Sequence, residues 1–156
     1  MGAVLFYRIT RSSVDATVRN LATRALSQGW RVAVRGRSTE RLDRLDNDLW
    51  LGPDEDFLPH GMAGGPYDAD QLVLLTTAAA HTNAAVALMA LEGADFAPAD
   101  VTGMERVWVI FDGNDPYQLE VARNQWRMAV SAGLSAQFWA EEDGSWKKKE
   151  ESGPAT

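Results

Sequence analysis

Three residues in the last third of the chain, Arg123, Trp126 and Arg127, could bind an anion that carries an apolar group. If this segment is a helix, the i, i+3 and i+4 spacing places their side chains next to one another on its surface. Two guanidinium groups can form paired hydrogen bonds with carboxylates, and an indole ring can pack against an aromatic group. These side chains would suit an anion with an attached apolar or aromatic group, for example a peptide carboxylate together with its last side chain. From the pattern alone, the alternative is that Trp126 belongs to the core and both arginines are solvated.

A second set of residues, Trp50 followed by Phe57-Leu58-Pro59, could form an apolar surface for a protein partner. Aromatic side chains contribute much of the binding energy at protein interfaces. The chain contains 6 tryptophans, more than one small core needs, so we expect some of them at the surface. The same residues could equally be core residues at a helix end and in a short extended segment, and the pattern leaves both interpretations open.

Asp112 is the residue best placed for nucleotide or phosphoryl chemistry, because it follows the apolar segment 107–111. An aspartate in such a position binds magnesium in nucleotide hydrolases. However, the turn at residues 8–13 has no GxGxxG pattern, and the chain has no GxxxxGK[ST] phosphate loop. The glycine-rich segment 61–65 also lacks the lysine of such a loop, and we predict that it is a plain connecting loop. We therefore predict that Asp112 is a solvated turn residue, and we keep a small nucleotide- or phosphoryl-handling α/β protein as the alternative function.

The composition disfavours several other kinds of chemistry. The chain has 156 residues, no cysteine and 2 histidines, so it offers no thiol nucleophile and no convincing metal site, and we expect no cofactor. Its 22 acidic and 15 basic residues give a net charge of −7, which disfavours direct binding of DNA phosphates over a broad face. The apolar runs are too short to span a membrane and the first residues do not resemble a signal peptide, so we expect a soluble, cytoplasmic protein.

The candidate residues must be positioned by alternating strands and helices. Runs of β-branched, aromatic and other apolar residues predict buried strands at 4–7, 31–34, 72–75, 107–111 and 135–140. Segment 84–91 is rich in alanine, and its composition alone does not distinguish a strand from a helix.

Helix signals lie between these strands. Apolar residues recur at helical spacing from residue 14 until Gly29, Ser38 is a candidate N-cap, and Asp115 and Gly133 bound the last helix. Strands that alternate with helices imply an α/β fold with a mostly parallel, twisted sheet flanked by helices. We predict one domain over residues 1–147, followed by a polar, flexible tail at 148–156.

The order of these motifs resembles the chi subunit family of bacterial DNA polymerase III. The resemblance extends from about residue 3 to 147, and each motif is weak by itself, but the ordered set is specific. The matching segments are Leu5-Phe6-Tyr7, Gly29-Trp30-Arg31-Val32, Arg41-Leu42-Asp43 through Leu49-Trp50, Phe57-Leu58-Pro59-His60, Ala122-Arg123 through Trp126-Arg127, and Ala132-Gly133. The resemblance also favours a strand for segment 84–91.

The resemblance implies a Rossmann-like three-layer sandwich without nucleotide-binding glycines, and a non-catalytic accessory subunit. Members of the family pair with the psi subunit, which connects them to the clamp loader. They also bind the acidic, phenylalanine-ended C-terminal tail of single-strand DNA-binding protein. Arg123 and Arg127 would bind the carboxylates of that tail, and Trp126 would flank its phenylalanine. Trp50 and Phe57-Leu58-Pro59 would contact psi, or a helicase that competes for the same face, and the protein would reach DNA only indirectly.

The sequence departs from the family pattern at Leu119, where the family has a basic residue one helical turn before Arg123. This departure would weaken the tail site or move its charge elsewhere, for example to the lysines at 147–149. A domain that binds other protein partners is the remaining alternative.

Overall fold

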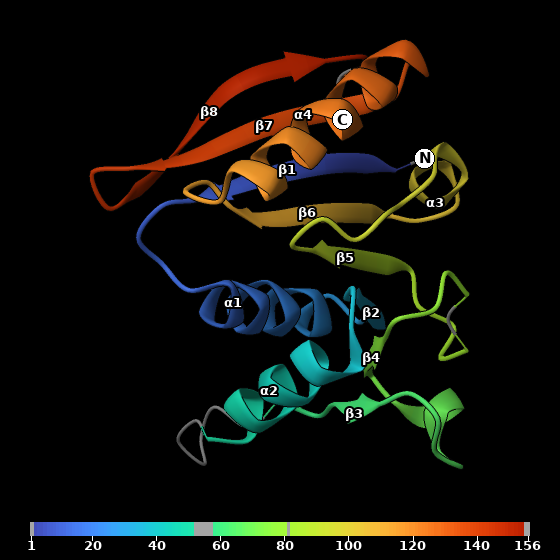
Figure 1. Cartoon of the computed structure of the whole chain (residues 1–156). Helices are drawn as coiled ribbons and strands as arrows, with labels where there is room; N and C mark the ends of the chain where they lie inside the picture. Colours follow the sequence, from blue (N-terminus) through green and yellow to red (C-terminus); the bar gives the residue numbers. More distant parts are fainter. Residues whose placement is uncertain (1, 52–57, 81, 155–156) are drawn as a thin grey trace.

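One eight-stranded sheet organises the chain, with the strand order β3-β4-β2-β5-β6-β1-β7-β8 (Figure 1). The computed structural model describes residues 2–51, 58–80 and 82–154. All neighbouring strands are parallel except β7 and β8, which are antiparallel. In chain order the elements are β1 (Ala3–Ile9), α1 (Val14–Ser27), β2 (Val32–Arg35), α2 (Thr39–Trp50), β3 (Gly61–Met62), the 3-10 helix η2 (Asp68–Asp70), β4 (Val73–Thr76), β5 (Ala87–Leu91), α3 (Pro98–Thr102), β6 (Arg106–Asp112), α4 (Pro116–Ser131), β7 (Ser135–Glu142) and β8 (Ser145–Ser152).

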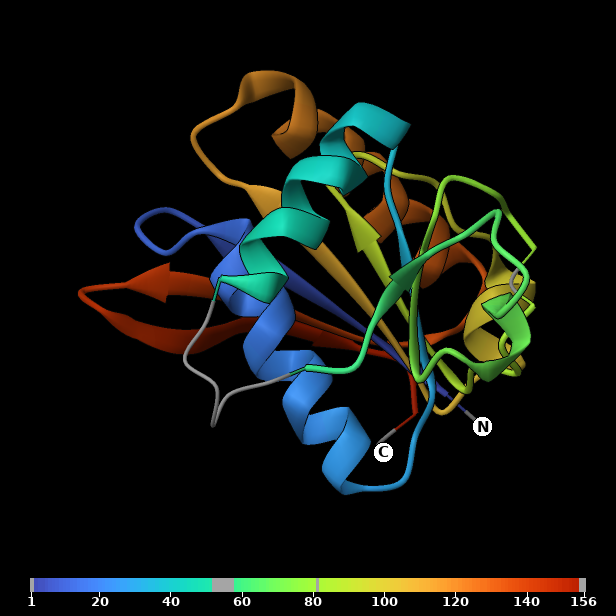
Figure 2. The ribbon, with the colours of Figure 1, turned by 90° about the horizontal axis from the view of Figure 1, so that it is seen from below.

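Helices cover both faces of this sheet. On one face, α1 and α2 lie side by side (Figures 1 and 2), and Leu21 and Leu45 pack with sheet residues such as Val34. On the other face lie α3 and α4, where Ala122 packs with sheet residues such as Phe6. The fold is therefore a three-layer α/β sandwich with a mostly parallel sheet, as the sequence predicted.

The helix boundaries follow the capping residues identified in the sequence. The Ser38 hydroxyl accepts a hydrogen bond from the N–H of Arg41 at 3.2 Å at the start of α2. The Asp115 carboxylate accepts two backbone N–H groups at 2.9 and 3.1 Å at the start of α4, where Pro116 is the first helical residue. Gly29 and Gly133 have φ of +80° and +70° just beyond the ends of α1 and α4.

In two segments in the middle of the chain, the structure contains a strand that the composition alone did not indicate. The ambiguous segment 84–91 contains β5, whose five residues are all buried between β2 and β6. Because both faces of β5 are covered by helices, it is apolar throughout and shows no alternation. The glycine-rich segment 61–65, predicted as a loop, begins with β3, a two-residue strand at the sheet edge.

The prediction of a flexible tail at 148–156 is wrong for most of that segment. Residues 145–152 form β8, which pairs with β7 and places Trp146 against Tyr7 at a ring-centroid distance of 5.0 Å. The segment is polar because β8 is an edge strand, and edge strands commonly carry lysine and other charged residues. Its composition was therefore mistaken for that of an unstructured end.

We predict that Trp146→Ala loosens β8 and lowers the free energy of unfolding by about 2 kcal/mol, because the indole is partly buried in the core. Amide hydrogen exchange in β8 should become faster while exchange in β6 stays slow. Lys147→Ala, at an exposed position of the same strand, is the control and should change neither. Rapid exchange throughout β8 in the unmodified protein would contradict the strand itself.

Candidate functional site

The turn between β1 and α1 is closed around a carboxylate from β7. Glu141 accepts hydrogen bonds from the backbone N–H groups of Thr10, Arg11 and Ser12 at 3.1, 2.8 and 2.9 Å, and from the Ser12 hydroxyl. In open α/β sheets this turn is where phosphate groups of nucleotides bind. Here the protein's own side chain occupies the donors that a phosphate would need.

Burial of the Glu141 carboxylate by itself would raise its pKa. The hydrogen bonds from the Ser12 hydroxyl and from the three backbone N–H groups favour the charged form more strongly and lower the pKa of Glu141 to about 2. The carboxylate is therefore ionised throughout the physiological range. It accepts the hydrogen bonds of the N–H groups of this turn, as a bound anion would.

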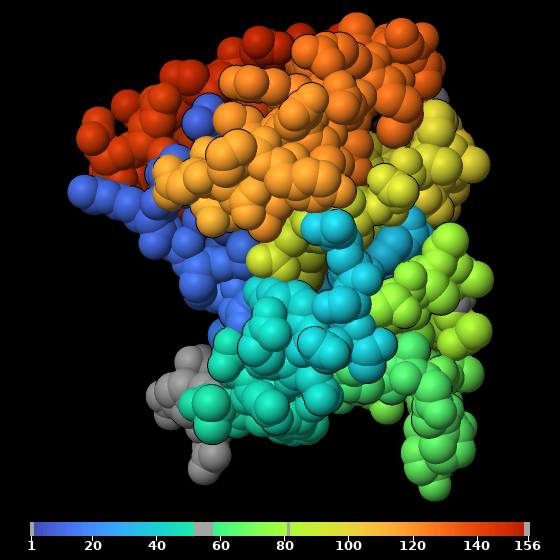
Figure 3. Space-filling view, in the orientation of Figure 1, coloured from blue at the N-terminus to red at the C-terminus, as the bar shows by residue number. Residues whose placement is uncertain are grey.

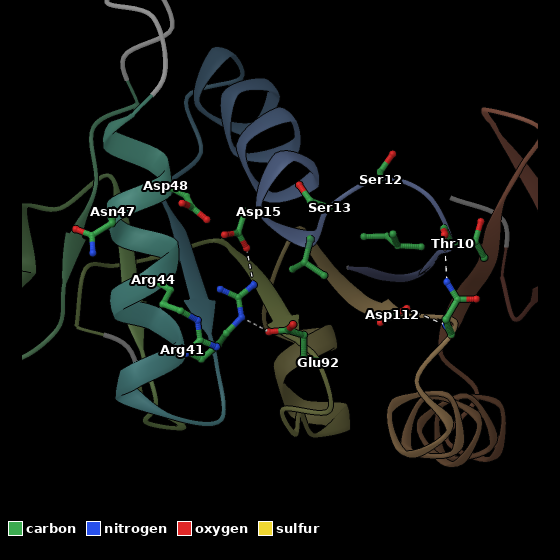
Figure 4. A pocket seen from close by; sticks show the side chains of 13 residues that line it. Thr10, Ser12, Ser13, Asp15, Arg41, Arg44, Asn47, Asp48, Glu92 and Asp112 are labelled. Atoms are coloured by element: carbon green, nitrogen blue, oxygen red, sulfur yellow. Dashed lines mark hydrogen bonds and ion pairs between the residues drawn. The ribbon is translucent and has the colours of Figure 1, made fainter.

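A cleft of about 650 Å³ lies beside this turn, at the carboxyl ends of the strands, and we call it the edge cleft (Figure 4). Arg41 crosses it and pairs with Asp15 at 2.5 Å and with Glu92 at 2.7 Å. The Asp112 carboxylate at its margin accepts the N–H of Asn114 at 2.8 Å. Arg41 is paired with two carboxylates and Asp112 organises its own turn, so neither is arranged to bind a phosphate. This agrees with the interpretation of Asp112 as a turn residue. Arg44, which is exposed, is the other arginine in the lining of the edge cleft.

Metal and membrane sites find no support in the described part of the chain. Within residues 2–51, 58–80 and 82–154, no three His, Cys, Asp or Glu side chains are grouped so that they could hold a metal ion. In the same residues, no helix has both the length and the apolar character needed to cross a bilayer. The other candidate site that the sequence analysis identified is the surface around α4.

A pocket of about 360 Å³ lies between α4 and the β7–β8 hairpin, and we call it the α4 pocket. Its lining combines apolar and charged side chains. The apolar ones are Leu119, Trp126, Phe138 and Ala140, and the charged ones are Arg8, Arg123, Arg127, Glu142, Lys149 and Glu150. The three residues singled out by helix spacing thus share one pocket, with partners from β1, β7 and β8.

Trp126 serves both the core and the pocket. Its ring lies edge-on to Phe6 and Phe138, at centroid distances of 5.6 and 5.8 Å, and these two phenylalanines stack on each other at 5.9 Å. The ring is only partly buried and lines the α4 pocket. The two interpretations of Trp126 are therefore compatible, because a packed aromatic cluster holds the ring that faces the pocket.

Three arginines border the α4 pocket, and none has a carboxylate partner among the described residues. Arg123 forms no hydrogen bond or ion pair there, and Arg127 donates to the side-chain oxygen of Asn124 at 2.7 Å. Arg8 forms one long hydrogen bond, to the carbonyl of Gly113 at 3.4 Å. Their positive charge is thus available to an anionic ligand, unlike that of Arg41 in the edge cleft.

The structure describes only part of the apolar surface predicted from Trp50 and Phe57-Leu58-Pro59. Trp50, the last residue of α2, is half exposed, and its ring lies 4.3 Å from that of buried His60. Leu58 is only 2 % exposed and belongs to the core, and Pro59 is partly buried, so neither is an exposed part of the predicted surface. Phe57 lies outside the described residues.

The fold and these surfaces define a class: an α/β protein with a Rossmann-like sheet, a nucleotide turn filled by its own carboxylate, and an open cationic pocket with aromatic walls. The chain belongs to the DNA polymerase III chi subunit (HolC) family, because the model of that family matches residues 1–137. Comparison with curated proteins gives no match. The family is that of a non-catalytic accessory subunit of DNA polymerase III, which acts in DNA replication. The resemblance drawn from the sequence motifs is confirmed.

Several residues of these sites were missed in the sequence. Phe138 and Glu141 lie on opposite faces of β7, which is visible only once its register with β1 is known. Arg8 did leave a signal, because alternation along β1 places it on the same face as the buried Val4 and Phe6. Lys149 was not missed, because the lysines at 147–149 were named from the sequence as possible carriers of charge for this site, although most of that segment was predicted to be a tail.

We predict that Glu141→Gln lowers the free energy of unfolding at pH 7 by about 1–3 kcal/mol, because a charged hydrogen-bond acceptor is lost. The folded pKa of about 2 lies below the usual 4.5, so this stabilisation is complete above pH 4.5 and disappears as the pH falls to 2. Urea unfolding at several pH values should show the two proteins converging over that range. Glu120→Gln on the exposed face of α4 is the control. A difference that is independent of pH would contradict the assignment.

Proposed function

We propose that this protein links the psi subunit, and through it the clamp loader, to the C-terminal tail of single-strand DNA-binding protein in the cytoplasm. One observation carries the proposal: three arginines without carboxylate partners surround a pocket with aromatic walls, in a chain of net charge −7. An acidic protein that leaves arginines uncompensated around an apolar pocket is suited to an anionic ligand with an apolar end. Membership of the chi family supports the same ligand class.

The chemistry of the α4 pocket matches that of an acidic peptide ending in phenylalanine. A terminal phenylalanine can pack edge-on or offset against Trp126 and Phe138, as aromatic rings prefer. Arg123 and Arg127 are exposed on α4, where they can form charge-assisted hydrogen bonds with carboxylates. Because those two side chains are solvated, their contribution should weaken with salt, whereas the aromatic contacts should be less sensitive.

The two proposed partner surfaces lie on different faces of the sheet. Trp50 ends α2, which covers one face, and the α4 pocket lies on the other (Figure 1). Leu51, beside Trp50, is 80 % exposed, so an apolar surface is available for psi or for a helicase that uses the same face. This separation supports simultaneous binding of both partners.

We predict that Arg127→Ala weakens binding of the tail peptide by about 1.5–3 kcal/mol, the usual contribution of a hydrogen bond to a charged group. Fluorescence anisotropy with a labelled peptide of aspartates ending in phenylalanine measures this at two salt concentrations. An amidated peptide tests the need for the terminal carboxylate. Arg24→Ala, exposed on α1 across the sheet, is the matched control. Unchanged affinity of Arg127→Ala would remove this residue from the site.

We predict that Trp50→Ala weakens binding of psi by about 2 kcal/mol, roughly 30-fold, as for a central aromatic residue of an interface. Tail-peptide affinity should remain that of the parent, because Trp50 and the α4 pocket lie on different faces of the sheet. Calorimetric titration with purified psi gives the affinity, and Tyr67→Ala, another exposed aromatic, is the control. Equal loss of psi and peptide binding would indicate unfolding and contradict the assignment.

A further inference from the structure

Arg8 lies on the floor of the α4 pocket at the end of an otherwise apolar row. Alternation along β1 points Val4, Phe6 and Arg8 toward the face that α4 covers. Val4 and Phe6 are fully buried there, whereas Arg8 is partly buried and lines the pocket. In the space-filling view, N-terminal residues (blue) are visible between α4 (orange) and the β7–β8 hairpin (red) (Figure 3).

The hydrogen-bonding capacity of Arg8 is almost unused. Its Nη2 lies 3.4 Å from the carbonyl oxygen of Gly113, and its Nε is buried without a hydrogen-bond partner. A buried N–H group without a partner is costly, and most such groups in native proteins are paired. A guanidinium can donate several hydrogen bonds at once, which suits a carboxylate.

The fold makes room for this side chain with a glycine. A Cβ at Gly113 would lie 2.5 Å from Cγ and 2.6 Å from Nε of Arg8, and 2.9 Å from the carbonyl oxygen of Ile9. The N–H of Gly113 also donates to that oxygen at 2.6 Å, so the turn after β6 cannot easily move away. Gly113 therefore acts as a positioning residue that holds Arg8 in the pocket.

Lys149 is the other cation of the pocket that could replace the basic residue absent at Leu119, but it is already paired with a carboxylate. Lys149 pairs with Glu142 across the β7–β8 hairpin, at 3.2 and 2.9 Å to its two carboxylate oxygens. Arg8 has no such partner among the described residues. The uncompensated positive charge on the inner side of the pocket therefore comes from Arg8, on strand β1 of the sheet.

We infer that Arg8 binds the terminal carboxylate of the peptide, while Arg123 and Arg127 on the surface of α4 bind the acidic side chains that precede it. This inference rests on the proposed function. Arg8 lies on the floor beside Ala140 and the aromatic wall, whereas the two helix arginines are exposed. A peptide would thus enter with its last residue between α4 and β7, and its acidic part would leave over the surface of α4.

A double-mutant cycle between protein and peptide tests this orientation. The parent, Arg8→Gln and Arg123→Gln are each titrated with the labelled aspartate-phenylalanine peptide, as free acid and as amide. Amidation should weaken binding to the parent by about 10- to 100-fold, and Arg8→Gln should lose a similar factor for the free acid. Amidation should then cost Arg8→Gln less than about threefold, because the two changes remove the same interaction. Arg123→Gln should keep the full sensitivity to amidation.

The outcomes separate the two hypotheses. If Arg8→Gln remains as sensitive to amidation as the parent, the inference is overturned and the proposed function stands. If the parent itself does not bind the free acid, both are overturned.

A measurement on the unmodified protein covers the case in which Arg8→Gln does not fold. The Nε–H resonance of Arg8 should shift in NMR spectra on addition of the free acid and stay in place with the amide. Equal shifts with both peptides would overturn the inference. Gly113→Ala should reduce amidation sensitivity by displacing Arg8, with Gly65→Ala, at a glycine outside the pocket that has room for a Cβ, as the comparison.

Discussion

The hydrogen bonds between Glu141 and the β1–α1 turn link two regions of the molecule, the turn on one face of the sheet and the α4 pocket on the other. They join the end of β7 to the turn after β1, and the two strands run parallel with Phe6 opposite Phe138 and Arg8 opposite Ala140. In this register Glu141 points to the α1 face, where it fills the turn that binds phosphate in nucleotide-binding relatives of this architecture. Phe138 and Ala140 point to the other face, where they wall the α4 pocket. One carboxylate thus fills the turn where a nucleotide phosphate would bind, and it belongs to the strand that walls the proposed peptide site.

The distribution of charge is compatible with the proposed binding of an acidic ligand by an acidic protein. Several buried or partly buried arginines are compensated internally: Arg41 pairs with Asp15 and Glu92, and Arg35 pairs with Asp100. The arginines of the α4 pocket are not compensated in this way. Over distances greater than the Debye length, about 8–10 Å in physiological salt, the net charge of −7 is largely screened. A ligand at the pocket therefore responds to local cations, and broad contact with DNA remains unfavourable.

The sequence predicted features that depend on neighbours along the chain and missed those that depend on neighbours across the sheet. Ser38, Asp115 and Gly133 act through the first and last turns of helices, so their types were sufficient to place α2 and α4. The grouping of Arg123, Trp126 and Arg127 is likewise a consequence of helix geometry. In contrast, β8 is polar because it is an edge strand, and its structure depends on pairing with β7. Glu141 gains its role from the order of the strands, which composition does not encode, and for Arg8 alternation along β1 gave the face but not the neighbours.

The sheet between the two proposed partner surfaces also bears on whether binding at one can affect binding at the other. The central strands β2 and β5 are buried along their whole length, and such packed layers deform little. Coupling between two binding sites requires an element with two arrangements that both ligands bias. Between α2 and α4 the described residues form a continuous parallel ladder with an apolar core on each side, and no such element is seen among them. The affinities for psi and for the tail should then be independent, and the linkage between clamp loader and DNA-bound protein would arise from bivalent geometry and effective concentration rather than from allostery.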